Sequence, residues 1–189
     1  MEMELSQVLE GCKHNDQQAQ GCLYERFAPM LMGICYRYTH SHEDSRDLLH
    51  DAFIKIFTGI RTVRNEESLQ SWMCRVMVAT TIDYLRKRSG KDMVSDEVLK
   101  DDEGGNARYE SPVDTDPYEL SDIFDALEQL PDRYRIIFNM REVDEMEYDD
   151  ISAFTGLSEV AVRVTLFRAR TMLRNLLEEK SKKELRTNK

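Results

Sequence analysis

The chain has 189 residues, 41% of them hydrophobic and 33% charged, with a formal net charge of −10. No apolar run approaches the roughly 20 residues that a membrane-spanning helix needs, and the acidic N-terminus lacks the basic and apolar regions of a signal peptide. We therefore expect a cytoplasmic protein of one or two domains, and with only 8 Gly, 4 Pro and no long β-branched alternation we expect an all-α fold.

The cysteines and histidines show no metal-binding spacing. No CxxC pair occurs, and the histidines are scattered along the first third of the chain. We predict free, mostly buried thiols in a reducing compartment, and neither a metal site nor a cofactor. The cysteines are Cys12, Cys22, Cys35 and Cys74.

Taken in chain order, hydrophobic periodicity first predicts helices over residues 5–17, 18–38 and 43–57 and a fourth helix that begins at Ser68 or Ser71 and ends near residue 87. Together they form a first domain over residues 1–90. Ser41 or His42 is expected to cap the third helix. Its apolar residues should point inward, while acidic residues and a lysine face out (Asp44, Asp47, Asp51, Lys55). The predicted core residues of the fourth helix are Trp72, Val76, Ala79 and Tyr84.

Residues 91–117 combine Gly104-Gly105, two prolines and many carboxylates, which predicts a flexible acidic linker. A second domain over residues 118–180 should begin with helices over residues 120–130 and 132–141. The distribution of charge along the chain agrees with two domains joined by an acidic linker. Residues 61–92 carry a net charge of +3 (7 basic, 4 acidic) and residues 156–189 carry +5 (9 and 4), whereas residues 93–130 carry −10 (2 and 12).

Two separated basic regions favour two contacts with nucleic acid, because charges act locally at a Debye length of roughly 8 Å. The acidic linker competes with DNA for the same arginines, which indicates a protein that binds DNA only together with a partner.

The second domain ends in a predicted helix-turn-helix. Ile151 and Phe154 share one face of a short helix, Gly156 provides the turn, and Ser158 caps a longer helix. The predicted buried stripe of that helix is Val162, Leu166, Ala169, Leu173 and Leu176. Four arginines lie outside it (Arg163, Arg168, Arg170, Arg174), as in a helix that enters the major groove of DNA. The alternative is a plain solvated face.

The motifs resemble the sigma-70 family of RNA polymerase factors, in its extracytoplasmic-function (ECF) group. Residues 47–57 (DLLHDAFIKIF) and 72–86 (WMCRVMVATTIDYLR) are similar to region 2. Residues 126–131 (ALEQLP) and 162–170 (VRVTLFRAR) are similar to region 4. The resemblance implies two small helical domains and a factor that does no chemistry but directs polymerase core to promoters. The implied partners are promoter DNA, the β′ coiled coil and β flap of polymerase, and often an anti-sigma factor that is frequently membrane-bound; no small-molecule substrate is implied.

The resemblance also implies roles for individual residues. The predicted polymerase-binding residues are Asp47, Leu48, His50, Asp51 and Lys55, where His50 replaces the usual Gln. The predicted contacts to the melted −10 element are Arg61, Arg64, Asn65, Arg75, Arg86 and Arg88. Ala79 stands where the family has an Asn that helps to form a base pocket. We expect Trp72 to be a core residue more than a stacking platform.

The predicted contacts to the −35 duplex are Arg163, Val164, Phe167 and Arg168. Thr165 replaces a frequent basic residue, which should remove a phosphate contact. We expect the lysines at the C-terminus to be part of a frayed, solvated end (Lys180, Lys182, Lys183, Lys189).

Two other functions fit parts of the sequence. A freestanding helix-turn-helix regulator would bind an operator alone, although the acidic linker argues against it. A metal-dependent nuclease would use the carboxylates around the turn before the helix-turn-helix (Glu142, Asp144, Glu145, Glu147, Asp149), but no nucleophile–base pair or phosphate-binding loop accompanies them. We expect no catalytic residue.

Overall fold

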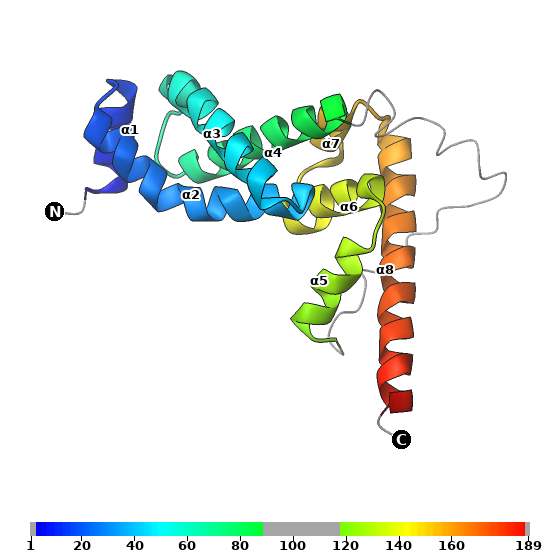
Figure 1. Cartoon of the computed structure of the whole chain (residues 1–189). Helices are drawn as coiled ribbons and strands as arrows, with labels where there is room; N and C mark the ends of the chain where they lie inside the picture. The colour runs from blue at the N-terminus through cyan, green and yellow to red at the C-terminus, as the bar shows by residue number, and fades with distance from the viewer. Residues whose placement is uncertain (1–2, 89–117, 188–189) are drawn as a thin grey trace. The chain divides into compact units, whose positions relative to one another are not determined.

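The computed structural model describes residues 3–88 and 118–187, and within these ranges every regular element is a helix (Figure 1). The prediction of an all-α fold is therefore confirmed for this part of the chain. The chain divides into two compact units, Met1–Ser89 (unit 1) and Gly90–Lys189 (unit 2), and each is described by itself. The predicted acidic linker over residues 91–117 lies outside the described residues.

Unit 1 is organised around α2, which contacts each of the other α-helices of the unit. α3 and α4 also pack against each other, so that the core lies between these three helices, and α1 covers one end of α2 (Figure 1). Leu23, Ile56 and Met73 are fully buried between them. The elements are α1 (Leu5–Lys13), α2 (Gln17–Thr39), α3 (His42–Gly59), the 3₁₀ turn η1 (Ile60–Thr62) and α4 (Leu69–Arg88).

Side-chain caps set the helix boundaries of unit 1. α1 ends before the predicted residue 17 because Asn15 adopts a left-handed conformation with φ 60°. Asp16 then caps α2, its Oδ1 accepting a hydrogen bond from the amide of Ala19 at 2.9 Å. Ser41 caps α3 in the same way, accepting from the amide of Asp44 at 3.1 Å. Of the two residues predicted to cap this helix, Ser41 is the one that does so.

The buried face of α4 differs from the predicted face. Met73 and Met77 are fully buried, and so are Thr80 and Thr81. The threonine hydroxyls donate to the carbonyl groups one turn earlier, at 2.8 and 2.9 Å, so these polar residues enter the core with their hydrogen bonds satisfied. The predicted core was wrong because apolar residues occur all round this helix. The four residues predicted for the core are only half-buried: Trp72, Val76, Ala79 and Tyr84.

Unit 2 is organised along α8, against which α5, α6 and α7 all pack. Figure 1 shows α5 beside the C-terminal half of this long helix. Leu130, Ile136 and Ile137 are fully buried and join α5 and α6 to it. The elements are α5 (Leu120–Glu128), α6 (Asp132–Phe138), the π-helical turn η4 (Asn139–Val143), α7 (Tyr148–Thr155) and α8 (Glu159–Thr187).

The helix predicted over residues 132–141 is not uniform, because α6 widens into the π-helical turn η4. The carbonyl of Asn139 accepts from the amide of Asp144 at 2.9 Å, and that of Met140 accepts from the amide of Met146 at 2.9 Å. Glu145 has a positive φ of 53° and turns the chain toward α7. π-helical turns are rare and often occur at functional sites. This turn places Arg141 next to the start of α7.

The inner face of α8 was predicted correctly over its first turns, where Val162, Leu166, Ala169 and Leu173 are buried. The stripe continues through Leu177, which is fully buried, and not through the predicted Leu176. A step of four residues keeps the stripe in line with a straight helix of 3.6 residues per turn.

Thr165 is fully buried, so its position faces the core of unit 2. The prediction for the C-terminal lysines is wrong for Lys180. Lys180 is not part of a frayed end, because its Nζ pairs with Asp122 at 2.7 Å and Asp125 at 2.8 Å on α5. These pairs hold the last turns of α8 against α5. The side chains of Lys183 and Lys189 lie outside the described residues.

Among the described residues, none of the helices combines the length and apolar character needed to cross a membrane. The four cysteines all lie in the described part of the chain and form no disulfide; Cys12 and Cys35 are buried, while Cys22 and Cys74 are half-buried. Burial raises the pKa of the Cys12 thiol to about 11 and also raises that of Cys35. These two thiols are therefore unreactive at neutral pH.

Candidate nucleic-acid interfaces

The outward side of α3 carries most of the predicted polymerase-binding residues. Asp47, His50, Asp51 and Lys55 are exposed there. Leu48 is only 4% exposed, because its side chain packs in the core of unit 1. All five predicted residues lie on α3, so the helix fixes the four exposed residues relative to one another.

Ile54 was not predicted as a site residue. It lies on α3 among the exposed residues and is 54% exposed, an unusual position for an isoleucine. Nearby, Tyr24 of α2 is 43% exposed, and its ring centroid lies 4.6 Å from that of Phe53. The signal in the sequence was an apolar residue outside the inward-facing stripe of α3. We call the exposed residues Asp47, His50, Asp51, Ile54 and Lys55 the α3 outer face.

A pocket of about 410 Å³ opens between η1 and the first turns of α4. Asn65 closes the loop at its rim, its Oδ1 accepting from the amide of Ser68 at 3.1 Å and from the hydroxyl of Ser68 at 2.6 Å. Trp72 forms part of the wall, so the half-buried indole has one surface available in the pocket. The lining residues are Thr62, Val63, Arg64, Asn65, Ser68, Ser71, Trp72 and Arg75. We call this the loop pocket.

Gly59, at the end of α3, packs against Trp72 in the wall of the loop pocket. A Cβ atom at this position would lie 3.0 Å from Cζ2 of Trp72. The indole therefore packs directly on the backbone of α3, which fixes the wall of the pocket. Trp72 thus has a packing contact as well as an open surface in the pocket.

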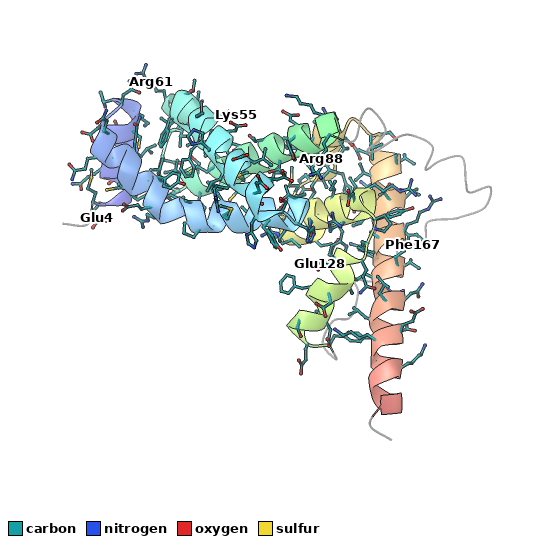
Figure 2. All side chains as sticks on the ribbon, viewed as in Figure 1. Glu4, Lys55, Arg61, Arg88, Glu128 and Phe167 are labelled. Atoms are coloured by element: carbon teal, nitrogen blue, oxygen red, sulfur yellow. The ribbon has the colours of Figure 1, made fainter. Side chains whose placement is uncertain are left out.

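The structure brings together three of the six predicted −10 residues. Arg64, Asn65 and Arg75 all line the loop pocket. Arg61 lies away from it and donates from Nε to the carbonyl of Lys13, at 3.0 Å. The other two lie near the C-terminal end of α4, where Figure 2 labels Arg88: Arg86 is 3.9 Å from a carboxylate oxygen of Asp83, and Arg88 pairs with Asp44.

The helix-turn-helix forms as predicted. Gly156 ends α7 with φ 77°, a left-handed conformation that glycine adopts without strain. Ser158 caps α8, its hydroxyl oxygen accepting from the amide of Ala161 at 3.2 Å. This geometry sets the direction in which α8 leaves the turn.

The predicted −35 residues all lie in the first turns of α8. Arg163 is exposed, while Val164, Phe167 (labelled in Figure 2) and Arg168 are half-buried. Arg163 lies 3.5 Å from a carboxylate oxygen of Glu159, and Arg170 pairs with Glu142. We call Arg163, Val164, Phe167 and Arg168 the recognition face.

Tyr148, the first residue of α7, was not predicted as a site residue. Two guanidinium groups lie over its ring: Cζ of Arg163 is 3.8 Å from the ring centroid and Cζ of Arg141 is 4.7 Å from it. These distances are within the range of cation–π contacts. No pattern in the sequence indicates this cluster, because its members come from η4, α7 and α8.

The carboxylates proposed for a nuclease are dispersed or already paired. Glu142 is bound to Arg170, and Glu147 lies 3.6 Å from Arg141. Within residues 3–88 and 118–187, no three histidine, cysteine or carboxylate side chains are grouped so that they could hold a metal ion.

Comparison with known proteins gives a consistent result. The family models for sigma-70 region 2 and sigma-70 region 4 match residues 23–91 and 120–173. RNA polymerase sigma factor SigV of Bacillus subtilis is 28% identical over 141 residues, which cover 75% of this chain and 80% of that protein. The ECF RNA polymerase sigma-E factor of Haemophilus influenzae is 27% identical over 181 residues, which cover 90% and 94%.

Among solved structures, the sigma factor RpoE in complex with the anti-sigma factor NepR from Bartonella quintana has a similar fold. The TM-score is 0.52 at 20% sequence identity, covering 82% of this chain and 94% of that one.

The two family models match in the same order as the two units, one in each. A freestanding regulator would need only the helix-turn-helix, so this alternative leaves the whole of unit 1 without a role. The chain therefore belongs to the sigma-70 family of RNA polymerase sigma factors, in its ECF group, and is a transcription initiation factor that directs the polymerase to promoters.

Proposed function

We propose that three surfaces of this chain divide the work of initiation. The α3 outer face binds core polymerase, the loop pocket holds a base of the melted −10 element, and the recognition face reads the −35 element as duplex. The loop pocket carries most of the proposal, because it combines two arginines with an aromatic wall in a cavity of about 410 Å³. Phosphates pair with arginine and bases stack on aromatic side chains, which is the combination used to bind single-stranded DNA.

The α3 outer face suits a basic, helical partner such as the β′ coiled coil. Its two aspartates provide charge complementarity, which steers association and excludes wrong partners. Ile54 supplies an apolar contact among them, with 54% of its surface available for burial. Apolar anchors inside a polar rim usually carry most of the energy of an interface.

The recognition face suits the major groove. Arg163 is exposed on the outer side of α8 and can make a bidentate contact with guanine. Val164 and Phe167 offer apolar surface to thymine methyl groups. Arg168 lies on the same outer side, and its guanidinium suits either a base edge or a phosphate.

Unit 2 also offers a surface to the β flap. Phe124 of α5 is 57% exposed, and large exposed aromatic side chains are typical anchors of protein interfaces. Lys180 ties α5 to α8 through Asp122 and Asp125, so this phenylalanine is presented by a braced helix.

We propose that an anti-sigma factor, membrane-bound in many members of the family, competes with polymerase for this chain. The RpoE protein with a similar fold was solved in complex with the anti-sigma factor NepR. The exposed apolar residues Ile54 and Phe124 are the surfaces that an inhibitor would have to cover.

We propose further that the chain has no catalytic residue, binds no metal or cofactor and acts on no small-molecule substrate. The carboxylates of a nuclease site would have to be free to hold Mg²⁺, and Glu142 and Glu147 pair with arginines instead. Cleavage of DNA by a pure preparation in the presence of Mg²⁺ would contradict this.

Transcription reconstituted from core polymerase and the full chain tests the proposal, with promoters first found by sequencing transcripts after controlled overexpression. Arg64→Ala should slow promoter opening, measured by the fluorescence of 2-aminopurine placed in the −10 element, and should do so far less on a template that is already melted. Arg61→Ala is the matched control, because this arginine belongs to the same loop but bonds to Lys13 away from the pocket. Equal effects of the two variants, or no promoter-specific transcript at all, would refute the proposal.

A further inference from the structure

Arg163, Tyr148 and Arg141 form a continuous stack in unit 2. The guanidinium carbons of the two arginines lie 3.8 Å and 4.7 Å from the centroid of the tyrosine ring. From these contacts we infer that Tyr148 is a positioning residue for −35 recognition, which holds Arg163 in the orientation that reads a base. This inference rests on the proposed role of the recognition face.

One of the two arginines that contact Tyr148 is anchored by the backbone. Arg141 donates from Nη1 to the carbonyl of Met146 at 2.7 Å, and this contact depends on the turn that follows η4. Arg141 is only partly exposed, with 28% of its side chain accessible. One face of the tyrosine therefore meets an arginine that the backbone itself holds. The turn after η4 holds Arg141, Arg141 contacts Tyr148, and Tyr148 contacts Arg163.

The carboxylates beside the stack cannot replace the ring as a restraint. Glu159 lies 3.5 Å from Arg163 and Glu147 lies 3.6 Å from Arg141, with their side chains 51% and 74% exposed. Ion pairs at such exposed sites are screened by salt and contribute little. DNA phosphates also repel both carboxylates and compete for both arginines. The uncharged ring is the contact that persists when DNA is bound.

Positioning matters for arginine because its side chain has many rotamers. A bidentate contact to guanine requires the planar guanidinium to lie in the plane of the base. An arginine that is already held against a ring loses less conformational entropy on binding than a free one. Tyr148 should therefore affect discrimination at the base pair that Arg163 reads, and not only the overall affinity for DNA.

The test uses the full chain with core polymerase on a promoter mapped with the wild-type protein. Binding is measured by competition for promoters that carry each base pair at the −35 position affected by Arg163→Ala. Tyr148→Phe keeps the ring and should bind like the wild type. Tyr148→Leu should weaken binding by about 2- to 5-fold, the range expected from a lost cation–π contact, and the loss should disappear on promoters without the preferred base pair.

A double variant separates positioning from a general effect on the fold. If the ring acts through Arg163, then Tyr148→Leu combined with Arg163→Ala should bind no more weakly than Arg163→Ala alone. Arg141→Ala, which leaves the tyrosine in place but removes its anchor, should reproduce the loss. Arg133→Ala is the matched control: it removes a stack of the same kind over Tyr134, at 4.5 Å, and should leave base discrimination unchanged.

Three results would overturn the inference. Additive losses in the double variant would show that Tyr148 acts independently of Arg163. An equal loss in Tyr148→Phe would assign the effect to the hydroxyl group. Unchanged discrimination in Arg141→Ala would show that the stack is not needed, even if Tyr148→Leu failed to fold. A wild-type protein that supports no promoter-specific transcription would instead refute the proposed function itself.

Discussion

Arg88 donates a hydrogen bond from Nη1 to Oδ2 of Asp44 at 2.8 Å and so joins the last turn of α4 to the first turn of α3. The other carboxylate oxygen of Asp44 accepts from the hydroxyl of Tyr84 at 2.7 Å. Arg88 was predicted to contact DNA, but here its guanidinium holds the helix that carries the α3 outer face. The surface proposed for polymerase and the end of a helix proposed for DNA are thus directly connected.

This connection predicts how unit 1 responds to acid. The hydrogen bond from Tyr84 holds the pKa of Asp44 below its usual value of 3.8, and the contacts from Ser41 and Arg88 act in the same direction. A carboxyl group whose pKa is lower in the folded state stabilises the fold above its unfolded pKa, and this stability is lost as the pH falls through the folded pKa. The free energy of unfolding should therefore decrease as the pH falls below about 4.

Asp44→Asn should remove that part of the pH dependence. Urea denaturation at pH values between 3 and 7, monitored through the fluorescence of Trp72, measures the free energy of unfolding of unit 1. Trp72 is the single tryptophan of the chain. Asp47→Asn, which removes an exposed carboxylate from the same helix, is the control and should keep the wild-type response. If Asp44→Asn lost stability in acid as steeply as the wild type, Asp44 would not be the group responsible.

Leu48 and Ile54 should behave in opposite ways when they are replaced by alanine. Leu48 is 4% exposed, so Leu48→Ala leaves a cavity and should lower the free energy of unfolding by about 2–5 kcal/mol. Ile54 is 54% exposed, and its replacement should change stability by no more than about 0.5 kcal/mol. Ile54→Ala should instead weaken binding to core polymerase, by about fivefold or more if it is an anchor. Titration of fluorescently labelled chain with core measures this, and unchanged affinity would exclude Ile54 from the interface.

Thr165 offers a route to a more stable protein. Its hydroxyl oxygen is buried without a hydrogen-bond partner, and an unsatisfied buried hydroxyl costs about 1–3 kcal/mol. Valine has nearly the same shape without the hydroxyl, so Thr165→Val should raise the free energy of unfolding by about 1 kcal/mol. Denaturation followed by circular dichroism checks the stability, and selection of −35 sequences should give the wild-type preference. A changed preference would mean that this position contacts DNA after all.

Gly156 should be needed for its backbone conformation alone. Its φ is 77°, and a Cβ atom placed there would meet nothing within 4 Å. Gly156→Ala should therefore cost about 1–2 kcal/mol, the penalty for a left-handed L-residue, with no added clash. Gly156→Asn should cost less, because asparagine tolerates this region better. Equal stability of all three proteins in thermal denaturation would show that the turn adopts another conformation in solution.

The sequence predicted the helices better than it predicted their faces. α3 and the start of α8 have one clear apolar stripe each, and their inward residues were mostly correct. α4 has apolar residues on every side, and two of its threonines enter the core because their hydroxyls bond within the helix. Periodicity counts threonine as polar, so it selected a face that is only half-buried.

The same distinction holds for the candidate interfaces. The sequence predicted arginines and an asparagine of the loop before α4 as DNA contacts, but only the folded chain separates Arg64 and Arg75, which line the loop pocket, from Arg61, which bonds to Lys13. Ile54 was missed although it lies outside the inward-facing stripe of α3, because the residues predicted there for polymerase binding were taken from the family motif. Sequence spacing cannot show which charged side chains already have partners within the fold.

The sequence by itself determined the all-α fold, the capping residue Ser158 and the glycine turn of the helix-turn-helix, because each depends on residues within a few positions of one another. Its motifs also determined the family. Only the tertiary structure decided that Tyr148 contacts both Arg141 and Arg163, that Asp44 pairs with Arg88, and that Thr165 faces the core. These contacts join residues from different elements, and the way in which helices pack depends on side chains along their whole length.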